Sequence, residues 1–281
     1  MTSFDPRLTP ARPDLADAKL RGRVQAERFV EGQAMEVLDA QAPLRREPRP
    51  DAPLDTEALK GERVTVYETT DEGWSWGQLQ NDGYVGWLPA NALGKPRRQP
   101  QHKISALRTF AFPGPDIKLP PLYSLPFGAQ LDVLRFEATF AVTPDGFIPA
   151  RHVAPLNQAD VDFVSVAERF LETPYLWGGK TSYGIDCSGL VQISLTACGI
   201  VCPRDSDMQE HAVGVSQSIN LADLKRGDLV FWKRHVAIAR DATTLIHANA
   251  HHMAVAIEPV AEAVARIRAS GSEITSLKRL G

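Results

Sequence analysis

The sequence predicts an α+β domain over residues 157–281, preceded by two small β-barrels. Residues 34–93 contain short runs of alternating apolar and polar residues, separated by the turn signals LKGE, TDEG and NDGY. The same texture resumes after the basic, proline-containing segment KPRRQPQ at residues 95–101. Beyond residue 157 the spacing of apolar residues is first helical and then strand-like. This order predicts helices followed by an antiparallel sheet.

Composition limits what the chain can do. With 281 residues, of which 43% are hydrophobic, the chain can bury a core in each of two or three domains. The 31 basic residues nearly balance the 34 acidic ones, so we expect no nucleic-acid partner. The polar, proline-broken N-terminus does not resemble a secretory signal, and no run approaches the roughly 20 apolar residues of a membrane span. We therefore expect a cytoplasmic protein with no membrane partner.

The two β-rich segments, residues 31–95 and 96–156, share one plan. Each has an early strand, a proline-rich loop, a strand after a glycine (KGERVTV against FGAQLDV) and a DG turn before an apolar strand (NDGYVGWLPANAL against PDGFIPARHV). Parallel features at this spacing predict two related barrels. Residues 1–30 remain as an N-terminal extension whose role the sequence does not reveal.

The C-terminal domain, residues 157–281, begins with a predicted helix. Apolar residues recur at helical spacing over ADVDFVSVAERFLE (159–172), and Pro174 ends this pattern. A second helix is expected over CSGLVQISLTACG, which begins at Cys187. The segments GDLVFW, HVAIA, TLIHANA and AVAIEPV are then predicted to be strands.

Cys187 is the candidate nucleophile. It lies in YGIDCSGL, where a glycine-bearing loop turns into the second helix. The positive end of a helix and its N–H groups favour a thiolate and can hold an oxyanion. A buried structural cysteine is the alternative, but the Asp, Ser and Gly neighbours make this position too polar for it. Only Cys198 and Cys202 accompany it, so we expect reduced thiols rather than a disulfide framework.

Two histidines are candidates for a base and its orienting partner. A thiol nucleophile needs an imidazole that stabilises it and later protonates the leaving amine. In HVAIARDATTLIHANA the polar turn around Asp241 predicts a hairpin that sets His235 opposite His247, or within one pair of it. Opposed residues of an antiparallel pair project from the same face. Two unrelated surface histidines are the alternative interpretation.

Five motifs, in family order, resemble those of the NlpC/P60 family. They are PYLWGG (174–179), DCSGL (186–190), RGDLVFW (226–232), HVAIA (235–239) and LIHA (245–248). The motif GYVGWL (83–88) resembles the bacterial SH3-like domains that often precede cell-wall hydrolase domains. The resemblance implies a papain-like α+β catalytic domain after two SH3-like barrels, and it covers most of the chain beyond the N-terminal extension.

The resemblance also assigns catalytic roles. It implies Cys187 as the nucleophile, His235 as the general base and His247 as the residue that orients the base. Tyr175 matches a tyrosine whose hydroxyl lies beside the cysteine, although an aromatic core residue is the alternative. Neither a cofactor nor a metal is implied.

The resemblance further implies a substrate. Similar proteins with SH3-like domains often cleave γ-D-glutamyl-L-diamino acid bonds, such as those to diaminopimelate, in wall-derived peptides with a free N-terminal L-alanine. Peptidoglycan stem peptides are then the expected partners, in cell-wall recycling. Asp186 and Ser188 match positions that bind the alanine amine, and Tyr84 resembles the tyrosine that closes the pocket. Glu47 aligns with an acidic residue of the same barrel, with solvated surface charge as its alternative.

The segment CPRDSDMQ resembles the part of the family that lies beside the active site. Arg204 is a candidate partner for a substrate carboxylate, and Asp205 and Ser206 are candidate peptide contacts. Capping of the following helix is the alternative for the last two.

The sequence departs from the family pattern at two places. Alanine stands at the second position after His235, where the family commonly has glycine, and the second barrel lacks the GYVGW motif. We expect that barrel to act as a spacer or cover.

Three other functions remain open. A metal site is one, and its candidate ligands form two sets: Cys198, Cys202 and His211, or His247, His251 and His252. A noncatalytic wall-peptide binder would not need a thiol beside an imidazole. A thiol amidase or acyltransferase acting on another amide would use the same residues equally well. The oligomeric state also remains open.

Overall fold

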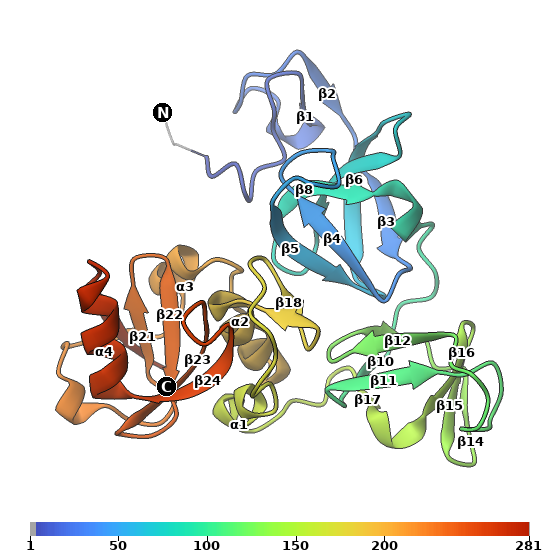
Figure 1. Ribbon diagram of the computed structural model, residues 1–281. Coiled ribbons are helices and arrows are strands. Elements are labelled where there is room, and N and C mark those ends of the chain that lie inside the picture. The colour runs from blue at the N-terminus through green and yellow to red at the C-terminus, as the bar shows by residue number, and fades with distance from the viewer. Residues whose placement is uncertain (1–3, 281) are drawn as a thin grey trace. The chain divides into compact units, whose positions relative to one another are not determined.

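The computed structural model describes residues 4–280, and the chain divides after Asn157 into two compact units. In Figure 1 the first unit runs from blue to green and the second from yellow-green to red. Across residues 4–280 no helix has both the length and the apolar character needed to cross a membrane.

The first β-rich segment forms a seven-stranded antiparallel sheet in the order β5-β4-β8-β7-β6-β3-β9. Its strands are β3 (Gln33–Val37), β4 (Gln41–Arg45), β5 (Leu54–Leu59), β6 (Arg63–Thr69), β7 (Trp74–Leu79), β8 (Val85–Pro89) and β9 (Leu93–Gly94). The predicted NDGY turn joins β7 to β8, and Gly83 has a φ of 76° that suits glycine. Strand alternation buries one set of side chains in a core that includes Leu44, Val64, Leu79 and Leu88.

The N-terminal extension packs on this same sheet. It contributes two short parallel strands, β1 (Leu15–Asp17) and β2 (Arg28–Val30). Leu15 is 1% exposed and lies in an apolar cluster with Trp76 and Trp87. The Arg12 guanidinium lies 4.4 Å from the ring centroid of Trp76, a cation–π contact. The described part of residues 1–30 therefore covers tryptophan side chains of the first sheet.

The second β-rich segment consists of three small antiparallel sheets around a separate core. Its strands are β10 (His102–Ile104), β11 (Arg108–Ala111), β12 (Tyr123–Pro126), β13 (Gln130–Leu131), β14 (Arg135–Glu137), β15 (Phe140–Thr143), β16 (Gly146–Pro149) and β17 (Val153–Pro155). Ile104, Leu125 and Ile148 are fully buried in that core. The Lys60 ammonium, from the first segment, lies 2.9 Å from the Asp145 carboxylate. That this segment is a second SH3-like barrel stays a prediction.

The second unit is α+β, as predicted, and contains a six-stranded sheet in the order β20-β25-β21-β22-β23-β24 (Figure 1). Its helices are α1 (Phe163–Glu168), α2 (Cys187–Ala197), α3 (Ser206–Ala212) and α4 (Val260–Ala269). Its strands are β18 (Lys180–Thr181), β19 (Gly184–Ile185), β20 (Val215–Gln217), β21 (Leu229–Trp232), β22 (His235–Ala239), β23 (Thr244–Asn249), β24 (Ala254–Pro259) and β25 (Ile274–Arg279). All neighbouring strands of the six-stranded sheet are antiparallel.

Both faces of this sheet are covered. Val230, Trp232 and Ala237 pack with α4 residues in one apolar cluster. The alternate residues Phe231 and Val236 are equally buried, which means that the opposite face is also shielded from water. The helix α2 contacts β22 and β23, the two strands that carry the candidate histidines.

The first predicted helix is shorter than expected. The pattern predicted residues 159–172, whereas α1 spans Phe163–Glu168. Asp162 caps its start, because its carboxylate accepts the N–H of Val164 at 3.0 Å. Glu172 adopts a φ of 66°, which lies outside the helical region. The chain therefore leaves the helix before Pro174.

Candidate active site

Cys187 is the first residue of α2, and its position is fixed by the residue before it. The Asp186 carboxylate caps the helix by accepting the N–H of Gly189 at 2.7 Å. A Cβ at position 189 would lie 2.4 Å from the carbonyl oxygen of Gly179, so only glycine allows the PYLWGG loop to approach this turn so closely. Cys187 as a whole residue is 8% exposed.

Arg204 lies in the interior and holds the capping carboxylate. Its Nη1 and Nη2 atoms lie 2.9 and 2.8 Å from the two Asp186 oxygens, and Nη1 also donates to the Ser188 hydroxyl at 3.0 Å. Arg204 is 1% exposed. Its predicted role toward a substrate carboxylate would require this pair to open, because the guanidinium is turned to Asp186 and not to solvent.

We predict that Arg204→Met destabilises the protein by about 3–5 kcal/mol, because the variant leaves the Asp186 carboxylate buried without its counter-charge. Urea denaturation of wild type and variant measures the difference. Arg268→Met is a matched control, since the Arg268–Glu273 pair is exposed and its loss should change stability by less than about 1 kcal/mol. Equal effects of the two substitutions would contradict this structural role of Arg204.

The two candidate histidines are in direct contact. The Nε2 atom of His235 lies 2.9 Å from Nδ1 of His247, and the His235 ring lies 5.7 Å from the Trp232 ring, with the two planes tilted by 41°. The hairpin register pairs Ile238 with Ile246, and continued along the strands it places His247 opposite Ala237. The two histidines are therefore diagonal neighbours on one face, two residues from direct opposition.

The hydrogen bonds determine where the ring protons lie. The Nε2 atom of His247 lies 3.1 Å from Oε2 of Glu258, and a carboxylate can only accept, so this nitrogen must carry the proton. Burial lowers the pKa of His247, which keeps the ring neutral and leaves Nδ1 as an acceptor. His235 must then donate through Nε2. Its own Nδ1 is the ring nitrogen that can accept a proton from a thiol.

Cys187 lies beside this pair. The backbone N–H groups of Val236 and Ser188 lie close enough to the thiol to lower its pKa, and the first of these residues directly follows His235. Tyr175 is close as well, because burial and then the charge of Cys187 raise the pKa of its hydroxyl. The Tyr175 backbone is fixed by an N–H bond to the carbonyl of Met253 at 2.9 Å. The structure thus brings all four predicted catalytic residues together.

Burial shifts the pKa values of the thiol and of His235 in opposite directions, and both shifts favour the neutral form. Burial, followed by the charge of Asp186, raises the pKa of the Cys187 thiol to about 12. Burial lowers the pKa of His235 to about 3. The expectation that the helix N-terminus favours a thiolate is therefore outweighed by desolvation. If Cys187 is the nucleophile, its proton has to leave as the bond to the substrate forms, and we expect His235 to accept it.

The other predicted residues of the second unit lie near α2 and α3. Ser188 is buried, and its hydroxyl lies 3.2 Å from an Asp186 oxygen. Asp205 occupies the N-cap position of α3, and Ser206 is its first residue and partly exposed. Their roles toward a peptide stay predictions.

The predicted residues of the first unit lie at different depths. Tyr84 is 3% exposed and belongs to the core of the first sheet. It also lines a hollow of about 880 Å³ together with Arg12, Trp76 and Trp87. Glu47 is exposed and pairs with Arg49 at 2.8 Å. The substrate-binding roles of both residues stay predictions.

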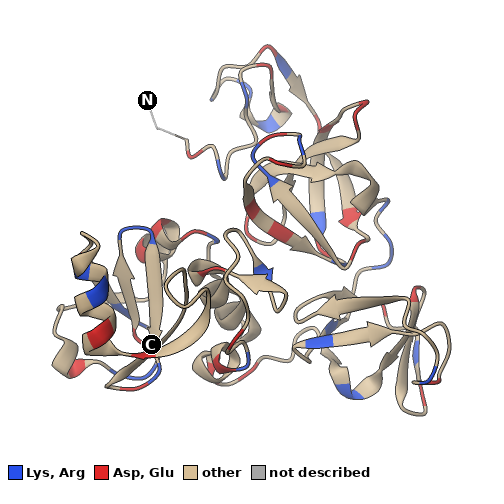
Figure 2. Cartoon of the chain, in the orientation of Figure 1, with Lys and Arg blue, Asp and Glu red and all other residues tan. Residues whose placement is uncertain are grey.

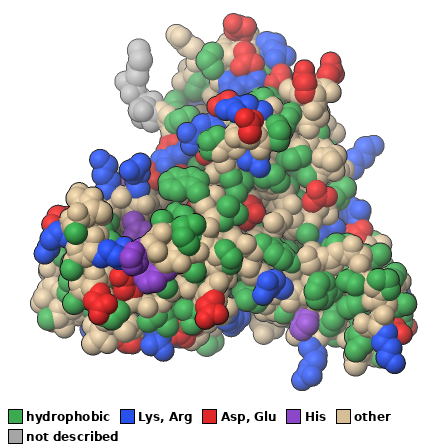
Figure 3. Space-filling view, viewed as in Figure 1, with side chains coloured by type: hydrophobic (Ala, Val, Ile, Leu, Met, Phe, Trp, Pro, Cys, Tyr) green, Lys and Arg blue, Asp and Glu red, His purple; other side chains and the backbone are tan. Residues whose placement is uncertain are grey.

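The metal alternative gains no support from the geometry. Within residues 4–280, no three His, Cys, Asp or Glu side chains are grouped as they would be to hold a metal ion. His251 and His252 are neighbours in an exposed turn, with ring centroids 4.8 Å apart. Figure 3 shows histidine side chains gathered on the visible face of this unit. Figure 2 shows acidic and basic residues interspersed over its elements.

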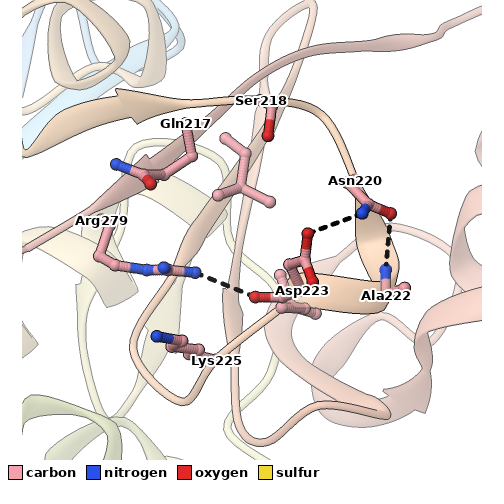
Figure 4. Close-up of a pocket in the computed structure, with 9 residues that line it drawn as sticks. Gln217, Ser218, Asn220, Ala222, Asp223, Lys225 and Arg279 are labelled. Atoms are coloured by element: carbon pink, nitrogen blue, oxygen red, sulfur yellow. Dashed lines mark hydrogen bonds between the residues drawn. The ribbon is translucent and has the colours of Figure 1, made fainter.

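A polar hollow of about 460 Å³ lies elsewhere on the second unit (Figure 4). Lys225, Arg279 and Asp223 line it, and the Arg279 guanidinium donates to the Asp223 carbonyl at 3.1 Å. None of the predicted catalytic or substrate-binding residues is among its lining residues. This polar hollow is therefore separate from the candidate catalytic residues.

Sequence reasoning missed two kinds of site residue. Glu258 lies behind His247, and Arg266 of α4 pairs with it. Gln209 is fully buried and donates to the carbonyl of Ser188 at 2.9 Å, tying α3 to the start of α2. Extending the predicted hairpin by one more strand would have set Glu258 near His247. Gln209 is the last residue of the CPRDSDMQ segment, which marked the region beside the active site but assigned no role to this glutamine.

The site combines three features: a thiol at a helix start, an imidazole beside it with one unprotonated nitrogen, and a second histidine that orients the first. This combination is that of a cysteine hydrolase.

Comparison with known proteins extends this assignment. Residues 172–271 match the NlpC/P60 family, and residues 44–93 match the bacterial dipeptidyl-peptidase Sh3 domain. The chain is 26% identical over 244 residues to a γ-D-glutamyl-L-lysine dipeptidyl-peptidase of Bacillus cereus, with 74% of this chain and 71% of that protein covered. A protein of the same name from Bacillus subtilis is 29% identical over 64% of each chain. The fold also matches the crystal structure of an NlpC/P60 family protein from Bacillus cereus, with a TM-score of 0.74, 21% identity, and 88% of this chain and 99% of that chain covered. The chain therefore contains an NlpC/P60 cysteine peptidase domain at residues 172–271 and a bacterial SH3 domain at residues 44–93.

Proposed function

We propose that this peptidase hydrolyses the γ-D-glutamyl-L-diamino acid bond of peptidoglycan-derived peptides that have a free N-terminal L-alanine. The observation that carries the proposal is the Cys187–His235–His247 array, in a chain whose similarity to γ-D-glutamyl-L-lysine dipeptidyl-peptidase extends over 74% of its length. The relatives are named for lysine, and the diamino acid cleaved here is either lysine or diaminopimelate.

The proposed mechanism follows from the proton positions. The Sγ atom of Cys187 attacks the γ-glutamyl carbonyl carbon while its proton passes to Nδ1 of His235. The backbone N–H at the start of α2 and the Tyr175 hydroxyl stabilise the oxyanion. His235 then donates the proton to the departing amine, leaving a thioester, and water activated by the same imidazole releases the dipeptide.

Recognition of the free amine is the finer part of the proposal. An ammonium needs oxygen acceptors and nearby negative charge. Ser188, next to the nucleophile in α2, offers a hydroxyl, and Ser206, Tyr84 and Glu47 are assigned to the peptide by resemblance alone. The Asp186 carboxylate is bound to Arg204, so we assign it the placement of the helix start rather than the amine itself.

Cell-wall recycling in the cytoplasm is the setting we propose. A stem peptide gains a free L-alanine amine when it is released from its glycan, so a requirement for that amine selects short free peptides over intact wall. The experiment below tests the amine requirement on which this setting depends.

The test is cleavage of L-Ala-γ-D-Glu-L-Lys and L-Ala-γ-D-Glu-diaminopimelate, each with a free and an N-acetylated alanine, followed by mass spectrometry. We expect cleavage of the free peptides, with kcat/KM reduced at least about 100-fold by acetylation, since a buried amine site left with a neutral, bulkier group loses a charge-assisted bond and meets a clash. Equal cleavage of both forms would contradict the amine requirement. Cleavage of neither would favour a different amide substrate or a binding role.

A further inference from the structure

Glu258 occupies a place directly behind the histidine pair. It lies in β24, which neighbours β23, and is paired in register with Leu245. His247 is two residues along β23 from Leu245, so Glu258 and His247 share a face of the sheet. The Oε2 atom of Glu258 lies 3.1 Å from Nε2 of His247. The hydrogen-bonded series therefore continues beyond the two histidines.

The Glu258 carboxylate is buried, and a buried carboxylate needs a positively charged or hydrogen-bonding partner. His247 is 1% exposed and Glu258 is 6% exposed. A buried carboxylate stays ionised only when charge and hydrogen bonds compensate its lost hydration. Arg266 supplies both, with Nε 2.9 Å from Oε1 and Nη2 2.6 Å from Oε2. His247 and Arg266 together hold the pKa of Glu258 well below its usual range.

The position of Arg266 follows from the chain. The helix α4 begins at Val260, directly after β24 ends at Pro259 (Figure 1). Its apolar residues Ala263, Val264 and Ile267 pack on the sheet. Packing of α4 therefore brings Arg266 back over the strand that carries Glu258. The carboxylate and its counter-charge thus come from one strand and the helix that follows it.

We propose that Glu258, held by Arg266, is a positioning residue that fixes the ring protons of both histidines. An ionised carboxylate accepts only, so it forces the His247 proton onto Nε2 and leaves Nδ1 as an acceptor. That acceptor draws the Nε2 proton of His235, and Nδ1 of His235 is left bare for the thiol. The reverse arrangement would put a proton on the nitrogen that must accept one, and the dyad would be inactive.

The same carboxylate supports the charge that forms during catalysis. When His235 takes the thiol proton it becomes an imidazolium that still donates through Nε2 to His247. The charged and titratable groups that act on His235 are His247, Arg266 and Glu258, and Glu258 alone among them favours the cation. His252 adds an unfavourable influence on His247. Glu258 thus acts through His247 and need not touch the substrate.

The direct test reads the ring nitrogens of the free protein by ¹⁵N NMR of labelled histidine. We expect both His235 and His247 of the wild type to be neutral near pH 7 with the proton on Nε2. A proton on Nδ1 of either ring would overturn the proposal. The reading needs neither a variant nor a substrate, so it is independent of the proposed function and of which peptide is cleaved.

The second test is Glu258→Gln, which keeps the shape but lets the amide donate as well as accept. We expect kcat to fall about 10- to 100-fold with KM changed less than about twofold, and Nδ1–H signals to appear on His247. The loss is set by analogy with carboxylates that orient metal-bound histidines, whose removal costs about that much. Glu273→Gln is the matched control, because Glu273 also pairs with an α4 arginine, Arg268, but is exposed and bonds to no histidine.

The outcomes separate a positioning role from a structural one. Loss of kcat with unchanged histidine signals would show a general structural effect and overturn the proposal, as would full activity of Glu258→Gln. If the variant does not fold, the wild-type proton positions decide alone. If no peptide is cleaved even by the wild type, the substrate assignment fails while the NMR result still stands.

Discussion

Replacement of Cys187 by serine is expected to lower kcat/KM for the free peptide by about 10,000-fold or more. Serine keeps the size and the first position of α2, but its hydroxyl is a far weaker acid and nucleophile than a thiol, and His235 is too weakly basic in this buried site to activate it. The measurement is peptide cleavage followed by mass spectrometry, with circular dichroism to confirm that the fold is kept.

Cys198→Ser provides the control for this substitution. Cys198 is the C-cap residue of α2, at the other end of the helix from the nucleophile. Its replacement should leave kcat/KM within about twofold of the wild type. Retention of substantial activity in Cys187→Ser, or an equal loss in both variants, would contradict the role of Cys187 as nucleophile.

Loss of the base should be nearly as severe. His235→Ala is expected to reduce kcat by about 1,000- to 10,000-fold, because the imidazole takes the thiol proton in one step and gives it to the leaving amine in the next. The pKa of the thiol is about 12, so without the base almost no thiolate exists at neutral pH. The residual activity of the variant should therefore rise with pH.

For the wild type, the informative part of the pH profile is the fall in kcat/KM at low pH. Burial lowers the pKa of His235 to about 3, so the neutral base persists well below the usual imidazole pKa of about 6.5. The acid limb of kcat/KM should accordingly lie below pH 6. An acid limb near pH 6.5, or a residual activity of His235→Ala that does not depend on pH, would show that the dyad is not neutral at rest.

Much of the catalytic unit could be predicted because its signals are local. The hairpin that carries the histidines follows from the turn residue Asp241, whose carboxylate accepts the N–H groups of Thr243 and Thr244 at 2.8 Å. The start of α2 follows from Asp186, which caps it. In both cases a side chain bonds to backbone a few residues away, and such bonds can be inferred from sequence order.

The parts that could not be predicted depend on contacts between distant residues. The strand β25 (Ile274–Arg279) is inserted between β20 and β21, and nothing near it in the sequence indicates that partner. Arg204 reads as a substrate ligand from its motif, whereas the structure binds it to Asp186, 18 positions away. Glu258 looked like an ordinary strand residue until the register of β23 and β24 placed it at His247.

In the first unit, too, the features with local signals could be predicted and those that depend on distant contacts could not. The DG turn and the alternation of β7 and β8 are local, and the sheet they predict is present. Leu15 packs on Trp76 and Trp87, in strands more than fifty residues away along the chain. The sequence of residues 1–30 therefore does not indicate where this extension packs. Tyr84 has a local motif, but its burial in the core follows only from the packing of the whole sheet.

The measurement that tests the central claim most directly is covalent labelling by L-Ala-γ-D-Glu diazomethyl ketone, which places a thiol-reactive group at the γ-carboxyl position. After digestion, mass spectrometry identifies the modified residue. We predict one adduct per chain, on Cys187, with loss of activity, and none on Cys198 or Cys202. Inactivation with Cys187 unmodified, or modification of either other cysteine instead, would contradict the account of Cys187 as the nucleophile of this peptidase.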